Sequence, residues 1–130
     1  MILLDTTFIV SFLVDTEKDH EKALKISKKL NNEKLVITNA ILIETINLLG
    51  KKLNKNTNAL FKTYESIKNN FEIIYEDEEL TERAMQTLVK YKAKIVADAI
   101  NMEVMKDLDI YEIFTFDEHF DNKEGIIRIH

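Results

Sequence analysis

The chain has no cysteine and no proline, and glycine occurs only at Gly50 and Gly125 among its 130 residues. Without cysteine, disulfides, thiolate nucleophiles and cysteine-based zinc sites are excluded. Any metal must therefore be held by oxygen atoms or by one of three histidines. With so little proline and glycine, Asn, Asp and Thr are left to end helices and to form turns.

Long hydrophobic runs are missing as well. Apolar stretches such as AILI at 40–43 fall far short of the roughly 20 residues that cross a bilayer. No basic segment precedes the apolar N-terminus. We therefore expect a soluble, cytoplasmic protein that has no association with a membrane.

The chain also lacks an excess of positive charge. Its 18 Lys and Arg residues face 23 Asp and Glu residues, which gives a net charge of −5. Such a balance is not typical of proteins that bind nucleic acid through their overall field. A nucleic-acid ligand would need a bridging metal or a local basic patch. Lysines at 90, 92 and 94 could form that patch, or they could simply mark the end of a helix.

The remaining composition is that of a globular protein, with 45% hydrophobic and 32% charged residues. The length suits one domain, 1–130, with a substantial core. Short apolar runs alternate with stretches of helical spacing, which predicts an α/β fold whose central parallel sheet of four to five strands is flanked by helices. The expected strands lie at 1–4, 34–38, 71–75, 110–116 and 126–129, and the expected helices at 6–14, 19–32, 40–50, 56–70, 77–92 and 95–110.

Several helix ends carry their own signals. Thr38 or Asn39 is suited to cap the helix at 40–50, and Gly50 is suited to close it. The stretch at 77–92 opens with acids and ends with lysines, which is the polarity that a helix dipole favours.

Four acidic residues lie close to the ends of expected strands. Asp5 directly follows the first strand, and Asp117 follows the fourth. Glu44 lies within two turns of the second strand, and Asp98 lies early in the helix at 95–110. Because ligands of an open parallel sheet bind outside the carboxyl ends of its strands, where the strand order reverses, we expect these acids to meet at one edge.

Each acid alone also has a structural interpretation. Asp5 and Asp117 could cap the helices that follow them. Glu44 could lie on a solvated stripe of its helix, and Asp98 could be structural too. Four separate solvated acids need not all follow strand ends in this order, so the joint pattern favours a site.

Four motifs carry these acids: LLDTTFIV at 3–10, ITNAILIETINLL at 37–49, VADAINMEVM at 96–105 and FTFDEHF at 114–120. They resemble the PIN domain family, and most closely its stand-alone, VapC-like ribonucleases of toxin–antitoxin systems. That family has a strand followed by DTS or DTT, an acid in the helix after the second strand, an Asp that opens a small-residue helix, and TxD followed by Phe. The match runs nearly from end to end.

The resemblance implies an endoribonuclease that hydrolyses RNA phosphodiesters through a catalytic, metal-binding quartet of Asp5, Glu44, Asp98 and Asp117. Asp5 and Asp98 would hold the main Mg²⁺ or Mn²⁺ ion, Asp117 would complete its shell or a second site, and Glu44 would position water or bind a second ion. The chemistry agrees, because carboxylates held close together repel one another and a divalent cation relieves that repulsion. The resemblance further implies a small antitoxin as partner and a homodimer.

Other residues follow from the same resemblance. Thr7 would support Asp5, and Thr115 would be the hydroxyl of the TxD element. The family usually has a glycine where this chain has DLDI at 107–110, and Asp121 adds an acid that could replace or assist Asp117.

The three histidines are expected at the surface, and none is paired with another at metal-binding spacing. His20 lies on a charged helix and His130 at the terminus, whereas His119 lies in a polar turn close to Asp117. The acidic total predicts a modest, salt-sensitive affinity for RNA.

Two other interpretations remain open. The chain could be a catalytically silent PIN-fold module that binds a protein partner. It could also be a receiver-like or phosphatase-like phosphoryl-transfer protein, since both classes place an Asp after the first strand. Those classes usually show two adjacent acids or DxDxT, and LLDTTF has neither.

Overall fold

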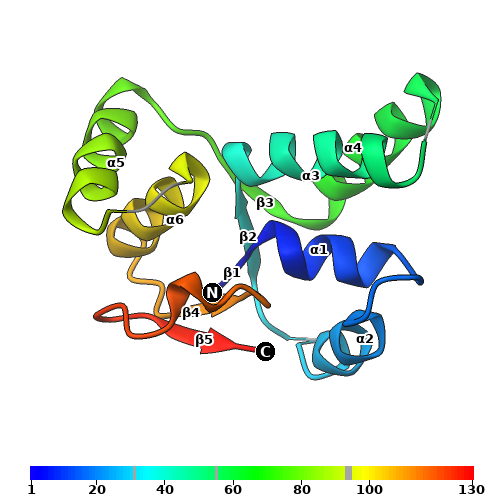
Figure 1. The fold of residues 1–130 in the computed structure, drawn as a ribbon, viewed down its shortest axis with the longest axis horizontal. Coiled ribbons are helices and arrows are strands. Elements are labelled where there is room, and N and C mark those ends of the chain that lie inside the picture. Colours follow the sequence, from blue (N-terminus) through cyan, green and yellow to red (C-terminus); the bar gives the residue numbers. More distant parts are fainter. Residues whose placement is uncertain (31, 55, 93–94) are drawn as a thin grey trace.

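The computed structural model describes residues 1–30, 32–54, 56–92 and 95–130, which form a parallel sheet between two layers of helices (Figure 1). The elements in chain order are β1 (Ile2–Leu4), α1 (Thr6–Leu13), α2 (His20–Lys28), β2 (Leu35–Thr38), α3 (Asn39–Lys52), α4 (Thr57–Asn70), β3 (Glu72–Ile74), α5 (Glu78–Lys90), α6 (Val96–Asp107), β4 (Glu112–Phe114), the 3₁₀ turn η1 (Glu118–Phe120) and β5 (Ile127–Ile129). The predicted α/β class is thus confirmed.

The strands lie in the order β3-β2-β1-β4-β5, and every neighbouring pair is parallel. The chain builds outward from β1 through β2 to β3, and then crosses back to place β4 on the other side of β1. The strand order therefore reverses between β1 and β4. In a sheet of this kind, the carboxyl ends of those two strands open the crevice where ligands bind.

Alternate residues of a strand face opposite helix layers, as the two-residue period of a strand requires. In β1, Leu3 packs into the core that includes residues of α5 and α6, whereas Ile2 and Leu4 pack into the core with α1 to α4. Figure 1 shows α5 and α6 on one side of the sheet and α1 to α4 on the other. Both faces of the sheet are covered, which explains why the central strand β1 is apolar throughout.

The ends of α3 show one correct and one wrong prediction. Thr38 caps the helix, since its Oγ1 accepts a hydrogen bond from the Ile41 amide at 3.2 Å. Gly50 does not close the helix, because α3 continues to Lys52. The turn that follows is made by Asn54, whose φ of 45° lies in the left-handed region that Asn tolerates.

The helix predicted at 95–110 is shorter than expected, because α6 ends at Asp107. Asp109 has a φ of 52°, and the Ile110 amide donates to the Met105 carbonyl at 2.8 Å to close the helix. Thus Asp109 takes a left-handed conformation in the segment where the family usually has glycine. Among the helices that the structure describes, none has the length and apolar character needed to cross a membrane.

Candidate acidic site

Asp5 is held at the carboxyl end of β1, with its side chain directed into the protein. Its amide donates to the Phe114 carbonyl at 2.9 Å, and the residue is only 3% exposed. Its Oδ2 accepts a hydrogen bond from Thr115 Oγ1 at 2.7 Å and a longer one from Thr7 Oγ1 at 3.4 Å. Asp5 stands at the N-cap position of α1 but makes no side-chain capping bond there, so the structure does not support capping as its role.

The two threonine hydroxyls join β4 to the start of α1. Thr7 Oγ1 and Thr115 Oγ1 lie 3.0 Å apart. Thr7 Oγ1 also accepts a hydrogen bond from the Phe116 amide at 2.9 Å, and Thr115 Oγ1 accepts one from the Asp117 amide at 3.0 Å. Both hydroxyls therefore fix the backbone that leads from β4 to Asp117, and both orient the Asp5 carboxylate.

Asp98 lies in the first turn of α6 and is 7% exposed. Burial, followed by the negative charges of Asp5, Asp117 and Glu44, raises its pKa to about 7. Burial also raises the pKa of Asp5 to about 6, although the hydrogen bond from Thr115 acts in the opposite direction. The charges of Glu44 and Asp117 therefore act on both Asp5 and Asp98, which shows that the four predicted acids lie close together.

Glu44 is half-buried on α3, and its Oε2 accepts a hydrogen bond from Thr6 Oγ1 at 2.8 Å. This bond turns the carboxylate toward the first turn of α1, next to Asp5. The solvated-stripe interpretation holds for Asn47, which is exposed, but Glu44 is directed toward the other acids.

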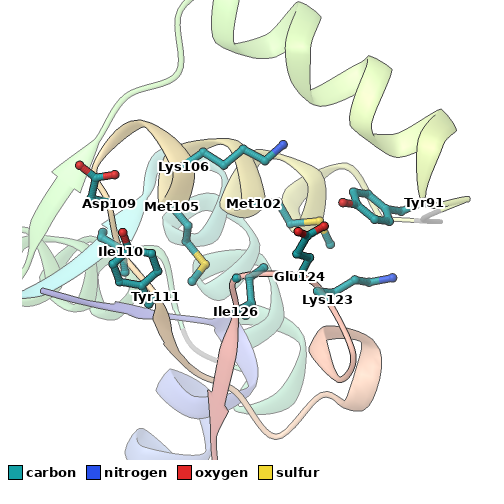
Figure 2. Close-up of a pocket in the computed structure, with 11 residues that line it drawn as sticks. Tyr91, Met102, Met105, Lys106, Asp109, Ile110, Tyr111, Lys123, Glu124 and Ile126 are labelled. Atoms are coloured by element: carbon teal, nitrogen blue, oxygen red, sulfur yellow. The ribbon is translucent and has the colours of Figure 1, made fainter.

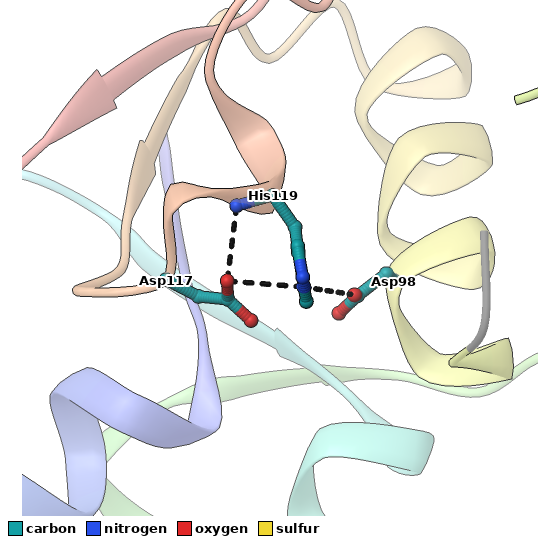
Figure 3. Close-up of side chains that lie close together, drawn as sticks. All are labelled: Asp98, Asp117 and His119. Atoms are coloured by element: carbon teal, nitrogen blue, oxygen red, sulfur yellow. Dashed lines mark hydrogen bonds and ion pairs between the residues drawn. The ribbon is translucent and has the colours of Figure 1, made fainter.

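Asp117 caps η1, because its Oδ1 accepts a hydrogen bond from the His119 amide at 3.0 Å. The His119 ring lies between two carboxylates (Figure 3), with Nδ1 3.1 Å from Asp117 Oδ1 and 3.9 Å from Asp98 Oδ2. One ligand atom from each of these three residues lies within 4.8 Å of the others. The sequence placed His119 at the surface, and only its spacing of two residues from Asp117 hinted at this position.

Asp121 does not join this group of acids. It forms an ion pair with Arg128 at the end of the chain, with Oδ2 3.0 Å from Arg128 Nη2. The hydrogen bond from Arg128 lowers the pKa of Asp121. Asp117 is therefore the acid that β4 directs toward Asp98.

Asn101 is a buried polar residue that the sequence did not single out as part of the site. It lies one turn after Asp98 and is 0% exposed. Its Oδ1 accepts a hydrogen bond from Thr38 Oγ1 at 3.1 Å, while its amide nitrogen has no hydrogen-bond partner among the described residues. Because Thr38 caps α3, this bond joins the helix that carries Asp98 to the helix that carries Glu44.

The lysines before α6 are only partly described. Lys90 lies in the last turn of α5, with its ammonium 5.2 Å from the centre of the Tyr91 ring, and Lys92 follows in the turn. Lys94 lies outside the described residues. The position of Lys90 fits the helix-end interpretation of these lysines.

A hollow beside Tyr91 lies against the middle and the carboxyl end of α6 (Figure 2). Met102, Met105 and Ile126 contribute apolar surface to it, and Lys106 and Lys123 contribute charge. It faces the amino ends of β4 and β5, and none of the four predicted acids lines it. This hollow is therefore separate from the acidic site, which lies at the carboxyl ends of β1 and β4.

The donor set at that edge fits a divalent cation. Asp5, Asp98 and Asp117 offer carboxylate oxygens, which Mg²⁺ and Mn²⁺ prefer, and His119 adds an imidazole nitrogen. A cation bound among these acids would offset both the burial and the mutual repulsion that raise the pKa of Asp98.

Fold and site together define an α/β protein with an acidic cluster at the switch point of a parallel sheet. The sequence model of the PIN domain family matches residues 2–126, and the chain belongs to this family. No curated protein sequence matches the chain.

Solved structures with the same fold include VapC20 from Mycobacterium tuberculosis, described as a toxin that cleaves the sarcin–ricin loop. It has a TM-score of 0.79 and 20% identity, and the match covers 91% of either chain. A toxin–antitoxin complex from Klebsiella pneumoniae has a TM-score of 0.71 and 20% identity over 98% of this chain and 96% of that one. DNA-bound VapBC from Salmonella typhimurium has a TM-score of 0.70 and 16% identity, with the same coverage of 98% and 96%.

Proposed function

We propose that this protein, as one PIN-like nuclease domain over 1–130, is a metal-dependent endoribonuclease and the toxin of a toxin–antitoxin pair. The observation that carries the proposal is the burial of Asp5 and Asp98 beside Asp117 and Glu44, which raises the pKa of the first two. Membership of the PIN family supports it, as does the likeness to VapC20, which is described as a toxin that cleaves the sarcin–ricin loop.

Each acid has a proposed part. Asp5 and Asp98 would hold Mg²⁺ or Mn²⁺, and Asp117 would complete the shell or a second site. When bound, the cation would polarise the phosphodiester and neutralise charge that develops on the leaving oxygen. Glu44, half-buried and held by Thr6, would accept a hydrogen bond from the attacking water and so orient it.

The threonines contribute orientation. Thr115 and Thr7 donate to the same oxygen of Asp5, Oδ2, and so orient its carboxylate. Outer hydroxyls of this kind fix the direction of a metal-binding carboxylate. Because the chain is acidic overall, RNA phosphates would be met by the cation and by nearby lysines, and the affinity would be modest and sensitive to salt.

We also propose a small antitoxin and a second copy of this chain as partners, acting in the cytoplasm where cellular RNA is found. The descriptions of similar structures include toxin–antitoxin complexes. A small protein encoded beside this one that co-purifies with it and suppresses its cleavage of RNA would support the first partner. A neighbour that neither binds nor inhibits would count against it.

The test compares wild type with Asp98→Asn, using Asp15→Asn as a matched control because Asp15 is an exposed acid away from the site. Thermal stability is measured with EDTA, Mg²⁺ or Mn²⁺, and cleavage is measured on a panel of structured RNAs. Asp98→Asn should relieve repulsion, so that the ion-free protein is as stable as wild type or more stable. Stabilisation by the ions and cleavage should both be lost, with cleavage reduced by at least about 100-fold.

Two results would contradict the proposal. If Asp98→Asn costs about 1 kcal/mol or more without metal and leaves stabilisation by ions intact, Asp98 is a structural hydrogen-bonding residue. If ions stabilise wild type but no RNA is cleaved, the protein is a PIN-fold interaction module. Asp15→Asn should match wild type in every measurement.

A further inference from the structure

We infer that His119 is a ligand in the acidic site and that it shifts the metal preference of the site from Mg²⁺ toward first-row transition ions. This inference rests on the proposed function, because it concerns the same site. It adds a residue outside the predicted quartet and a class of ion that this residue would select.

The His119 ring lies next to two of the acids. Its Nδ1 lies 3.1 Å from Asp117 Oδ1 and 3.9 Å from Asp98 Oδ2, so it shares the space between two acids that come from different elements (Figure 3). Capping of the turn involves only the His119 amide, so it does not account for the direction of the ring toward the first turn of α6. The ring is also accessible, since the side chain is 70% exposed.

Asp98 is buried, and its carboxylate has few partners among the described residues. This residue is 7% exposed, and within the described part of the chain no hydrogen bond to its carboxylate is found. Only the His119 ring approaches it among the described cationic groups. A carboxylate buried to this degree needs a partner, and the space that it shares with His119 and Asp117 has ligand atoms within 4.8 Å of one another.

The turn holds His119 in place. The His119 amide donates to Asp117 Oδ1 at 3.0 Å, and the next residue, Phe120, is 1% exposed and packs into the core beside α5 and α6. The backbone of His119 is therefore fixed on both sides.

The selectivity follows from the donor atom. Mg²⁺ prefers oxygen ligands and keeps several waters, so an imidazole nitrogen contributes little to its binding. Transition ions accept nitrogen, and their affinity for such sites rises from Mn²⁺ to Co²⁺. Loss of the imidazole should therefore weaken Co²⁺ binding most, Mn²⁺ binding less, and Mg²⁺ binding least.

A different role for His119 predicts a different result. If the ring only neutralises the acids when no ion is bound, it competes with every cation. Its removal would then raise the affinity for Mg²⁺, Mn²⁺ and Co²⁺ by the same factor. The ratios between the dissociation constants for Mg²⁺, Mn²⁺ and Co²⁺, rather than any single dissociation constant, therefore distinguish the two roles.

The experiment uses the full chain without an affinity tag. It compares wild type with His119→Asn and His119→Gln, and with His130→Asn as a control for a histidine at the terminus. Dissociation constants for Mg²⁺, Mn²⁺ and Co²⁺ are measured by calorimetric titration. Pulsed electron paramagnetic resonance of bound Mn²⁺ then detects coupling to a nitrogen ligand.

We expect both His119 variants to bind Mn²⁺ about 10-fold more weakly and Co²⁺ more weakly still, with Mg²⁺ changed by less than about 3-fold. The nitrogen coupling should be present in wild type and His130→Asn and absent from both His119 variants. Unchanged ion ratios, or nitrogen coupling that survives in the variants, would overturn the inference and leave the proposed function standing. If no ion binds wild type, both fail together.

Discussion

At the residue scale, the Asp5 carboxylate shows two opposing influences on one group. Burial raises its pKa, whereas the hydrogen bond from Thr115 stabilises the charged form, and the result is a pKa of about 6. Asp98 lacks such hydroxyl donors among the described residues, and its pKa is raised to about 7. The two acids therefore respond differently to pH although they belong to one coupled set.

These pKa values predict that the stability of the ion-free protein falls as pH rises from 5 to 7. Both acids have an ordinary pKa of 3.8 and hold their protons more tightly in the folded protein. Their favourable contribution is complete below that value and is lost as pH rises through about 6 and 7. Denaturant unfolding in EDTA at several pH values measures this slope.

Asp98→Asn is the control for this slope. The substitution removes the carboxyl group whose pKa is about 7, so the decrease in stability near pH 7 should become smaller. Added Mn²⁺ should reverse the trend in wild type, since the ion replaces protons and binds more tightly as pH rises. The stability of wild type in EDTA could instead increase from pH 5 to 7, by the same amount as that of Asp98→Asn. That result would contradict the raised pKa of Asp98 in the folded protein.

The sequence predicted that the four acids would lie near one another, as they do in the structure, but it did not predict their neighbours. Asp5 and Asp117 follow strand ends, and that rule depends only on where apolar runs stop. His119 and Asn101 could not be placed in this way, because the direction of a side chain in a 3₁₀ turn or on a buried helix face depends on tertiary packing. The hydrogen bond between Asn101 and Thr38 joins residues 63 positions apart, which no local pattern reveals.

At the scale of elements, a polar network sets the position of α6 against α5. Glu103 on α6 is 4% exposed, accepts a hydrogen bond from Thr87, and lies 3.0 Å from both Arg83 and Lys106. Arg83 also pairs with Asp107 at 2.7 Å. Since a buried carboxylate requires these partners, the network fixes which face of α6 turns inward, and with it the direction of Asp98.

The turn that ends α6 offers a second prediction. Asp109 has a φ of 52°, which costs a residue with a Cβ about 1–2 kcal/mol in general and less for Asp. Asp109→Gly should therefore be more stable than Asp109→Ala by about 1 kcal/mol, because glycine adopts this conformation freely. Denaturant unfolding of both variants measures the difference.

Gly125 provides the reciprocal control for that turn. It has a φ of 76° and open space where a Cβ would lie, so Gly125→Ala should cost stability through backbone strain alone. If Asp109→Ala proves as stable as Asp109→Gly, the turn after α6 relaxes to an ordinary conformation, and the explanation from the left-handed φ is wrong.

Element bounds were predicted from the sequence to within a few residues, and the errors have physical causes. The glycine at position 50 suggests a helix end there, but α3 continues to Lys52 and Asn54 supplies the left-handed residue instead. The helix at 95–110 was predicted too long because Leu108 and Ile110 continue its apolar pattern. They do so while packing against the core from a turn, and periodicity does not distinguish that case from a helix.

At the scale of the whole molecule, an apolar groove lies between α3 and α4. It is lined by Leu42, Ile46 and Leu60, with Ile43 53% and Phe61 59% exposed at its rim. Large apolar side chains on two adjacent helices suit a contact with a second copy, in which the same surface meets itself. This is where we place the proposed homodimer contact.

The dimer is tested with Phe61→Glu, and Tyr111→Glu is the matched control because Tyr111 is also 59% exposed. Wild type and the control should have twice the mass of one 15.2 kDa chain by light scattering. Phe61→Glu should have the mass of one chain with an unchanged circular-dichroism spectrum, since a charge on both sides of the contact would repel. A wild type with the mass of a single chain, or a Phe61→Glu protein that stays dimeric, would rule out this contact.

The pairing of β1 with β4 has a consequence for when the protein can act. Leu3 pairs with Ile113, and the hydrogen bond between Thr115 and Asp5 spans 110 positions, so the acids meet only after the chain has been synthesised beyond β4. Contacts between such distant segments form late in folding. While the ribosome is still making the segment before β4, the proposed nuclease site is therefore unassembled, and the growing chain could not attack RNA until Asp117 has been added.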